Sequence, residues 1–357
     1  MKVFYSEIHR RHNPPFEVFD GGRRMPYLET PERMDKILFA LEKTDWADIS
    51  QPADFGLEPI LAIHDPGYID FLASAWNEWI AGSAGLDSTP DNLVLLPATF
   101  ALRDQAHKPS SLLGRAGYYM MDLSACIVKG TYAAAMASAN CALSGAKYIA
   151  DCSNTSLPSS NLGETAFALC RPPGHHAGKD YAGGYCFINN AAVAANWLST
   201  GGKVALLDID YHAGNGTQDI FYTRSDVLTL SLHADPNNEY PYYAGYPDEG
   251  GAGEGLGLHH NFPLQPGITD TGYLATLDDA LNMIVGFSPK FLVISLGTDI
   301  YKDDPLGKFG ITTDGFHEIG KKIAALHIGS LIVLEGGYNN DALGENVVSF
   351  LTAFNQS

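Results

Sequence analysis

The segment Val204-Ala-Leu-Leu-Asp-Ile-Asp-Tyr-His ends an apolar run with three residues suited to chemistry, Asp208, Asp210 and His212. Side chains two residues apart on a strand point to the same side, so a strand that continues to His212 would align all three. Two carboxylates at the edge of a core are costly unless a cation or hydrogen-bond donors neutralise them, and a nearby imidazole favours a divalent metal ion. The alternative is that Asp208 and Asp210 cap loops.

Asp299 is the candidate for a third metal ligand. Catalytic zinc usually has three protein ligands and one open position. Asp299 follows the buried run that begins at Phe291, as Asp210 follows the run that begins at Val204. By itself an aspartate in this place would more often be a turn residue. Histidine and carboxylate ligands suit Fe²⁺ as well as Zn²⁺.

Two further motifs supply proton donors and acceptors. Arg171-Pro-Pro-Gly-His-His-Ala-Gly places His175 and His176 after a Pro-Gly turn, and such a pair suits proton transfer near neutral pH. Glu335-Gly-Gly-Tyr338 follows another buried run, and its glycines would let the phenol reach a developing oxyanion. The alternatives are surface histidines and a core tyrosine.

Apolar runs that alternate with helix-like segments must position these motifs. This order predicts a mainly parallel α/β sheet, in which ligands bind beyond the carboxyl ends of the strands. The stretch 76–117 is rich in Gly, Ser, Pro and Asp, which predicts an insertion loop within a single domain, 1–357. The predicted strands are Thr165–Leu169, Val204–Leu207, Val227–Leu232, Phe291–Leu296 and Leu331–Leu334, and the predicted helices include Asn189–Leu198 and Thr271–Val285.

Composition excludes several classes of protein. The net charge of −19 repels phosphate backbones, so we expect no nucleic-acid partner; it favours solubility first and would also suit a cationic substrate. The five cysteines are odd in number and form no C-x-x-C, which indicates reduced thiols rather than a disulfide framework. We expect a cytoplasmic protein without export signal or membrane span, because the start lacks a long apolar core.

The chain resembles the histone deacetylase superfamily, and within it the bacterial acetylpolyamine amidohydrolases. The resemblance rests on the Arg171, Asp208 and Glu335 motifs, on Gly183-Gly-Tyr-Cys-Phe-Ile-Asn-Asn-Ala and on Ser295-Leu-Gly-Thr-Asp, which occur in the expected order. It implies the arginase–deacetylase three-layer α/β/α sandwich, and a zinc ion bound by the same three residues chosen above.

The resemblance also implies roles for matching residues. His176 would be the general base and acid, His175 its electrostatic partner, and Tyr338 the oxyanion donor. Asp208 would orient His175, and Asn215 would support His176. A structural K⁺ site is implied at positions matching Asp208, Ser231 and Leu232, with the backbone of Asp210 and His212. Ala213 departs from the family, where a second histidine is common.

The substrate implied by the resemblance is a small acetylated polyamine or diamine, hydrolysed to acetate and free amine. Tyr185 and Tyr240 match tunnel walls that suit a slim alkyl chain, although both could be ordinary packing residues. Glu17 and Asp20 lie in a loop that could bind a distal ammonium group, with a solvated Asp20 as the alternative. The predicted insertion suggests a narrowed entrance at a homodimer interface.

Three other functions remain open. A protein acetyl-lysine deacetylase would share the chemistry and present a wide entrance. A ureohydrolase would bind two metal ions and need an aspartate where Gly214 stands. A non-catalytic acyl-lysine-binding scaffold would lack a ligand, His176 or Tyr338, and the sequence has them all.

Overall fold

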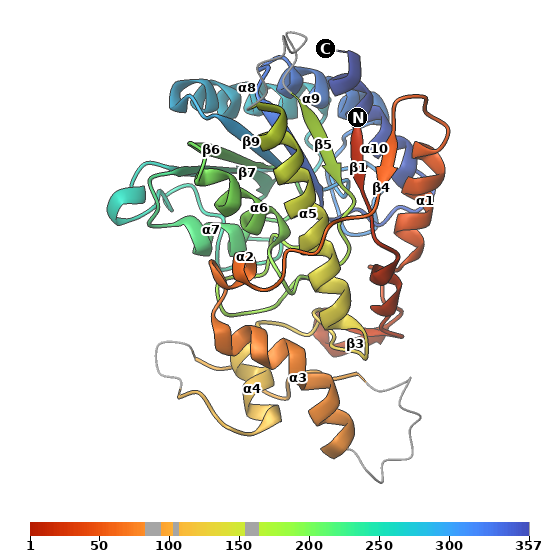
Figure 1. Cartoon of the computed structure of the whole chain (residues 1–357), viewed down its shortest axis with the longest axis vertical. Coiled ribbons are helices and arrows are strands. Elements are labelled where there is room, and N and C mark those ends of the chain that lie inside the picture. Colours follow the sequence, from red (N-terminus) through yellow and green to blue (C-terminus); the bar gives the residue numbers. More distant parts are fainter. Residues whose placement is uncertain (83–93, 103–106, 154–163, 357) are drawn as a thin grey trace.

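A central parallel β-sheet covered by helices forms the body of the molecule (Figure 1). The computed structural model describes residues 1–82, 94–102, 107–153 and 164–356. In this part of the chain eight strands pair in the order β4-β1-β5-β10-β9-β6-β7-β8, and each neighbouring pair is parallel. The strands are β1 (Lys2–Phe4), β4 (Asp48–Ser50), β5 (Thr165–Ala168), β6 (Val204–Asp208), β7 (Val227–Ala234), β8 (His259–Leu264), β9 (Phe291–Leu296) and β10 (Gly329–Leu334).

Helices cover both faces of the sheet, because strand side chains alternate between two cores. Along β6, Val204 and Leu206 join one core with α5 and α6, whereas Ala205 and Leu207 join the other with α8, α9 and α10. The predicted three-layer sandwich is therefore confirmed. The helices are α1 (Glu32–Leu41), α2 (Glu58–Leu61), α3 (Pro66–Gly82), α4 (Leu112–Tyr119), α5 (Thr131–Ser153), α6 (Asn190–Ser199), α7 (Asn215–Phe221), α8 (Asp270–Phe287), α9 (Thr313–Ala324) and α10 (Leu343–Gln356).

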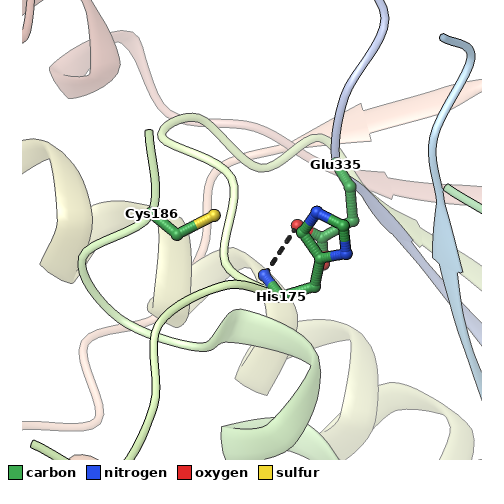
Figure 2. Close-up of side chains that lie close together, drawn as sticks. All are labelled: His175, Cys186 and Glu335. Carbon is green, nitrogen blue, oxygen red and sulfur yellow. Dashed lines mark hydrogen bonds between the residues drawn. The ribbon is translucent and has the colours of Figure 1, made fainter. Parts of the chain in front are cut away.

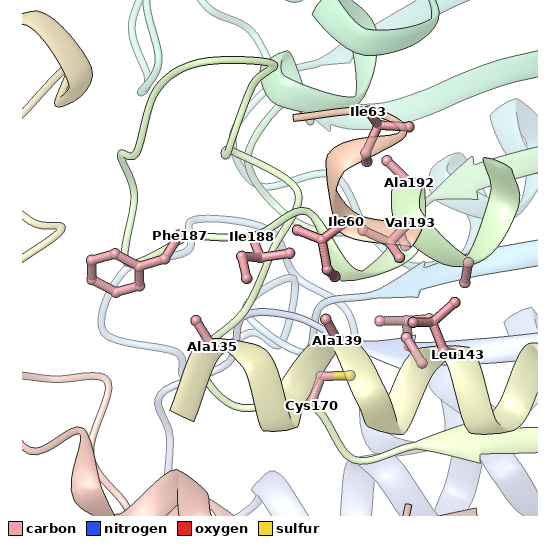
Figure 3. Packing of buried hydrophobic residues seen from close by; sticks show 14 of the residues in the cluster. Ile60, Ile63, Ala135, Ala139, Leu143, Cys170, Phe187, Ile188, Ala192 and Val193 are labelled. Atoms are coloured by element: carbon pink, nitrogen blue, oxygen red, sulfur yellow. The ribbon is translucent and has the colours of Figure 1, made fainter. Parts of the chain in front are cut away.

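The long helix α5 packs closely on the layer that carries α6. Ala135, Ala139 and Leu143 recur every four residues, so they lie on one face of α5. Figure 3 shows this face opposite Val193 of α6 and Ile60 of α2. The alanine side chains allow this close approach. The α5–α6 layer also holds the loop that follows β5, because Ser138 of α5 and Asn190 of α6 both donate hydrogen bonds to the carbonyl oxygen of Pro172.

Each of the five predicted strands is present, and so are both predicted helices. The strands β1, β4 and β8 were not predicted. Two of them have three residues each, too few to show a period, and β8 carries two histidines and an asparagine at the edge of the sheet.

The predicted insertion at 76–117 is partly helical. Residues 76–82 complete α3 and residues 112–117 belong to α4, two helices that lie at one end of the molecule in Figure 1. The apolar spacing of Leu72, Ala75, Trp76 and Trp79 continues α3 past the predicted start of the loop. Residues 83–93 and 103–106 lie outside the described part of the chain.

A short antiparallel hairpin, β2 (Glu17–Phe19) and β3 (Arg23–Met25), carries the loop singled out for Glu17 and Asp20. No helix in the described part of the chain is long and apolar enough to cross a membrane.

Candidate active site

Asp210, His212 and Asp299 come together just beyond the carboxyl ends of the neighbouring strands β6 and β9. Nδ1 of His212 lies 3.4 Å from Oδ1 of Asp210 and 3.3 Å from Oδ2 of Asp299. The expected alignment of Asp208, Asp210 and His212 required a strand that continues to His212. The strand β6 instead ends at Asp208. The loop after β6 brings Asp210 and His212 to Asp299. Asp208, the last residue of the strand, contacts His175 instead.

These three side chains fit a divalent metal ion. One ligand atom from each lies within 4.8 Å of the others. Ligand atoms bind zinc at about 2 Å, so these three atoms can reach a shared ion by moving slightly towards one another. Oδ2 of Asp299 is buried without a hydrogen-bond partner, which is costly unless a cation binds it. Burial and the Asp210 carboxylate raise the pKa of Asp299 to about 7. Burial opposes a charge on His212, but Asp210 and Asp299 outweigh it and raise the pKa of His212 to about 9. Both shifts reflect a site that favours positive charge.

Backbone groups fix the two carboxylates. The N–H of Tyr211 donates to Oδ1 of Asp299, and the N–H of Gly336 donates to Oδ2 of Asp210, both at 2.9 Å. A β-carbon at Gly297 would overlap the Asp210 carboxylate, and one at Gly336 would overlap the carboxylates of both aspartates. The cluster of Asp210, His212 and Asp299 therefore depends on close approach of the backbone at these glycines.

His175 and His176 lie beside this cluster with their ring centroids 3.9 Å apart. Nδ1 of His175 is 3.0 Å from Oδ2 of Asp208, and Nδ1 of His176 is 2.7 Å from Oδ1 of Asn215. Burial opposes a charge on His175, yet the carboxylates of Asp210 and Asp208 raise its pKa well above the ordinary value. Burial and the neighbouring His175 lower the pKa of His176 far below that value. The pair therefore divides into a charged and a neutral imidazole.

A buried carboxylate holds the loop that carries the two histidines. Oε2 of Glu335 accepts hydrogen bonds from the N–H groups of Gly174 at 2.6 Å and of His175 at 3.1 Å, and Figure 2 shows the second of these bonds. Cys186, His175 and Glu335 also form a group whose possible metal-ligating atoms lie within 4.8 Å of one another. The ring nitrogens of His175, however, face Asp208 and Asp210. We therefore infer that Glu335 positions the loop that carries the two histidines and does not form a second metal site.

His64 holds the far end of the same loop. Its Nδ1 lies 2.9 Å from the carbonyl oxygen of Gly178, and its Nε2 lies 3.1 Å from the backbone nitrogen of Asn189. A carbonyl can only accept and an N–H can only donate, so this geometry requires a neutral ring with the proton on Nδ1. Burial lowers the pKa of His64 to about 4, in agreement with that state.

Tyr338 reaches the site from the loop after β10. Oδ2 of Asp304 accepts hydrogen bonds from the N–H groups of Tyr338 at 2.7 Å and Asn339 at 3.0 Å. The guanidinium of Arg33 lies 5.0 Å from the centre of the Tyr338 ring and donates to the carbonyl of Gly337. These contacts fix the position of the phenol.

A cavity of about 640 Å³ opens onto His176, His212 and Tyr338. Tyr185 and Tyr240 line it, as the prediction for tunnel walls requires. Glu17 does not line it: this side chain is buried and its carboxylate accepts hydrogen bonds from the hydroxyl of Tyr185 at 2.7 Å and from the N–H of Leu28. The side chain of Asp20 lies outside what the structure describes.

The residues predicted to bind K⁺ also lie together. Asp208 and Ser231 are opposite each other in the register of β6 and β7, and Leu232 is the next residue of β7. The hydroxyl of Ser231 is hydrogen-bonded to Nδ1 of His233 at 2.7 Å.

The fold is the arginase–deacetylase sandwich, and its strand ends carry a carboxylate–histidine cluster beside a histidine pair. The chain belongs to the histone deacetylase family of hydrolases: the histone deacetylase domain matches residues 27–354. Acetylpolyamine amidohydrolase 1 of Pseudomonas aeruginosa is 43% identical over 359 residues and covers 99% of both chains. Acetylpolyamine amidohydrolase of Mycoplana ramosa is 40% identical, covering 98% of both chains.

A solved structure gives the same result. The crystal structure of acetylpolyamine aminohydrolase from Burkholderia pseudomallei superposes with a TM-score of 0.90 at 38% identity, covering 99% of this chain and 98% of that chain. The family predicted from the motifs, and with it the class of enzyme, is confirmed.

Sequence reasoning missed several residues that support the site. Glu335 lies inside a motif already singled out, so its position next to Gly336 was a usable signal. His64 and Asp304 belong to no such motif, and only the fold shows that they hold the loops that carry the histidine pair and Tyr338. Asp122, which lines the cavity, also had no signal in the sequence.

Proposed function

We propose that this protein hydrolyses the acetamide bond of small N-acetylated diamines and polyamines, using a zinc ion bound by Asp210, His212 and Asp299. The observation that carries the proposal is the meeting of this ligand cluster with His176 and Tyr338 at one cavity. An amidohydrolase needs a polarised carbonyl, a base for water and a donor for the oxyanion, and these residues supply all three.

The zinc ion would provide Lewis-acid polarisation of the amide carbonyl and of the attacking water. Neutral His176, held at Nδ1 by Asn215, leaves Nε2 to take the proton from that water. Tyr338 keeps its phenolic proton, since burial raises its pKa well above the usual value, and donates a hydrogen bond to the developing oxyanion. His176 then returns a proton to the departing nitrogen, because an amine leaves poorly as an anion.

A slim cationic substrate is supported by the walls and the charge of the protein. Tyr185 and Tyr240 present aromatic surface to an alkyl chain. The net charge of −19 attracts a protonated amine. The names of the relatives from Pseudomonas aeruginosa and Mycoplana ramosa point to acetylated polyamines as substrates.

The test is acetate release by zinc-loaded protein from N-acetylputrescine and N-acetylcadaverine, beside an acetyl-lysine peptide, with His176→Ala as the inactive control. Faster turnover of the small amides, absent in the control, would support the proposal. Preference for the peptide would reassign the function to protein deacetylation. If none of the three compounds is hydrolysed, the remaining possibilities are an enzyme that removes another acyl group and a non-catalytic scaffold. Replacing zinc by Fe²⁺ in the same assay tests the metal.

We also propose a homodimer and a structural K⁺ ion at Asp208, Ser231 and Leu232. The dimer is supported by Phe100, which belongs to the predicted insertion and lines the cavity while its side chain is partly exposed. Light scattering tests the dimer. A K⁺-dependent rise in melting temperature that Na⁺ does not reproduce tests the ion.

A further inference from the structure

Asp304 lies on the loop between β9 and α9, and its buried carboxylate binds two different segments of the chain. Oδ1 accepts a hydrogen bond from the N–H of Leu306 at 2.9 Å, within the same loop. Oδ2 accepts hydrogen bonds from the N–H groups of Tyr338 at 2.7 Å and Asn339 at 3.0 Å, in the loop after β10. The bond to Leu306 fixes the orientation of the carboxylate, so that its second oxygen faces the loop that carries Tyr338.

Arg33 binds the same loop through carbonyl oxygens. Its Nε donates to the carbonyl oxygen of Gly337 at 2.7 Å, and its Nη2 donates to that of Glu335 at 2.6 Å. A buried cation therefore holds carbonyl groups just before Tyr338, and a buried anion holds the N–H groups of Tyr338 and Asn339. Hydrogen bonds to charged groups are stronger than neutral ones, so the backbone at Tyr338 is held firmly on both sides.

The position of the Tyr338 backbone matters because of what its hydroxyl has to do. A donor stabilises a developing oxyanion from about 2.7–3.1 Å, and a misplacement of about 1 Å can lower a rate about 10²-fold. Tyr338 lines the active-site cavity, whereas Asp304 is not among the described residues of the lining. Asp304 can therefore act on the reaction only through a neighbour, and Tyr338 is the bonded neighbour with a role in the chemistry.

We propose that Asp304 is a positioning residue for the oxyanion donor, which affects the rate of amide hydrolysis through the placement of the Tyr338 hydroxyl. This inference rests on the proposed function. Asp304→Asn keeps the size of the side chain but replaces one acceptor oxygen by an amide nitrogen, which cannot accept the N–H bonds at that end. We expect kcat to fall about 10- to 100-fold, with KM within about twofold.

The test is a double-mutant cycle that combines Asp304→Asn with Tyr338→Phe, measured as kcat on N-acetylputrescine. In the enzyme that keeps Tyr338, Asp304→Asn should lower kcat about 10- to 100-fold. In the Tyr338→Phe background it should change kcat less than about twofold, because the hydroxyl that it would misplace is absent. Asp303→Asn is the matched control, since this neighbouring carboxylate is exposed and pairs only with Lys302 at 3.9 Å among the printed ion pairs of the described residues; it should change neither rate.

Equal losses in the two backgrounds would overturn the inference, because the loss would not depend on the phenol and Asp304 would be a structural residue. An unchanged kcat for Asp304→Asn in the enzyme that keeps Tyr338 would overturn it as well. If Asp304→Asn does not fold, Asp304→Glu, which keeps the charge and displaces the carboxylate, passes through the same cycle with the same expected result. Zinc content and melting temperature are measured for each variant.

A measurement that needs no turnover separates this inference from the proposed function. Fluorotyrosine in place of Tyr338 reports the surroundings of the phenol by fluorine NMR. The zinc-loaded protein, with and without Asp303→Asn, should give the same single narrow resonance, and Asp304→Asn should shift or broaden it. A changed resonance supports the positioning role even if no amide is cleaved. An unchanged resonance contradicts it even if the amidohydrolase function stands.

Discussion

The floor and the mouth of the cavity are built in different ways. We define the floor as Asp210, His212 and Asp299 with His175, His176 and Tyr338. The mouth comprises cavity-lining residues from separate segments: Val18, Phe19, Gly21, Gly22, Phe100, Asp122, Leu123, Ser124, Tyr240, Tyr242, Pro305, Leu306 and Lys308. The floor lies at the ends of buried central strands, and backbone N–H groups and glycines hold its carboxylates. The mouth consists of segments far apart in the sequence and partly exposed, including Phe100 at 44% and Tyr242 at 46%. We therefore expect the fold to determine the chemistry and the loops of the mouth to determine the substrate.

The largest expected effect comes from the floor. Asp299→Ala should abolish turnover and lower bound zinc from about one ion per chain towards none, because His212 and Asp210 alone leave too few ligands. Metal analysis after dialysis measures this, with the exposed Asp341→Ala as control. Full zinc content in the Asp299 variant would place the metal elsewhere and remove the basis for calling this the floor.

Tyr338→Phe tests the oxyanion donor separately from the metal. The variant keeps the ring beside Arg33 and loses only the hydroxyl. We expect kcat to fall about 10²–10³-fold, with zinc content and melting temperature unchanged. Steady-state kinetics on N-acetylputrescine measures the split between kcat and KM. A rise in KM at constant kcat would mean that the phenol binds substrate instead.

The pH dependence of stability tests how firmly the loop behind the floor is held. Burial lowers the pKa of His64 to about 4. Between pH 6.5 and 4, His64 is therefore protonated in the unfolded chain and neutral in the folded chain. Its contribution to stability is therefore present above pH 6.5 and is lost as the pH falls through this window, by up to about 1.4 kcal/mol per pH unit.

His64→Gln should remove this slope. The measurement is the free energy of unfolding by urea at several pH values, for both proteins. The variant should be less stable at pH 7, where the glutamine amide cannot make both bonds to Gly178 and Asn189 as the imidazole does, and the difference should narrow towards pH 4. Parallel curves for the two proteins would contradict a neutral, buried His64.

The smallest expected effect belongs to the mouth. Tyr240→Phe removes the hydroxyl that bonds to Asp122 and keeps the ring beside His176. One hydrogen bond of this kind contributes about 0.5–1.5 kcal/mol, so KM should rise about 2- to 12-fold and kcat should stay within about twofold. A loss of kcat as large as that of Tyr338→Phe would show that the mouth takes part in the chemistry.

The sequence indicates for a physical reason that the residues of the floor lie close together. Buried parallel strands are long apolar runs, and polar residues that follow them stand out, as Asp210 and Asp299 do. The geometry differed from the prediction in one respect: β6 stops at Asp208, so a loop rather than strand periodicity brings His212 to the other ligands. The contact of Asp208 with His175 likewise depends on the turn of a loop.

The mouth could not be predicted in the same way. Asp122 meets Tyr240 across 118 positions of sequence, and no periodicity records such a contact. Glu17 shows the converse, since an acidic residue in a loop was expected to face the substrate and is instead buried behind Tyr185. Solvation of a loop carboxylate depends on which segments cover it, and that is a property of the whole fold.

The glycines beside the cluster of Asp210, His212 and Asp299 have a practical consequence for mutational scanning. Gly297 and Gly336 carry no functional group, yet any side chain there would displace the carboxylates of Asp210 or Asp299. In a complete scan scored by activity, both positions would rank with the catalytic residues. A scan scored by abundance would separate them from the catalytic residues only if displacing the carboxylates destabilised the fold. Library designs that seek new substrates should therefore hold these two positions fixed and diversify the mouth.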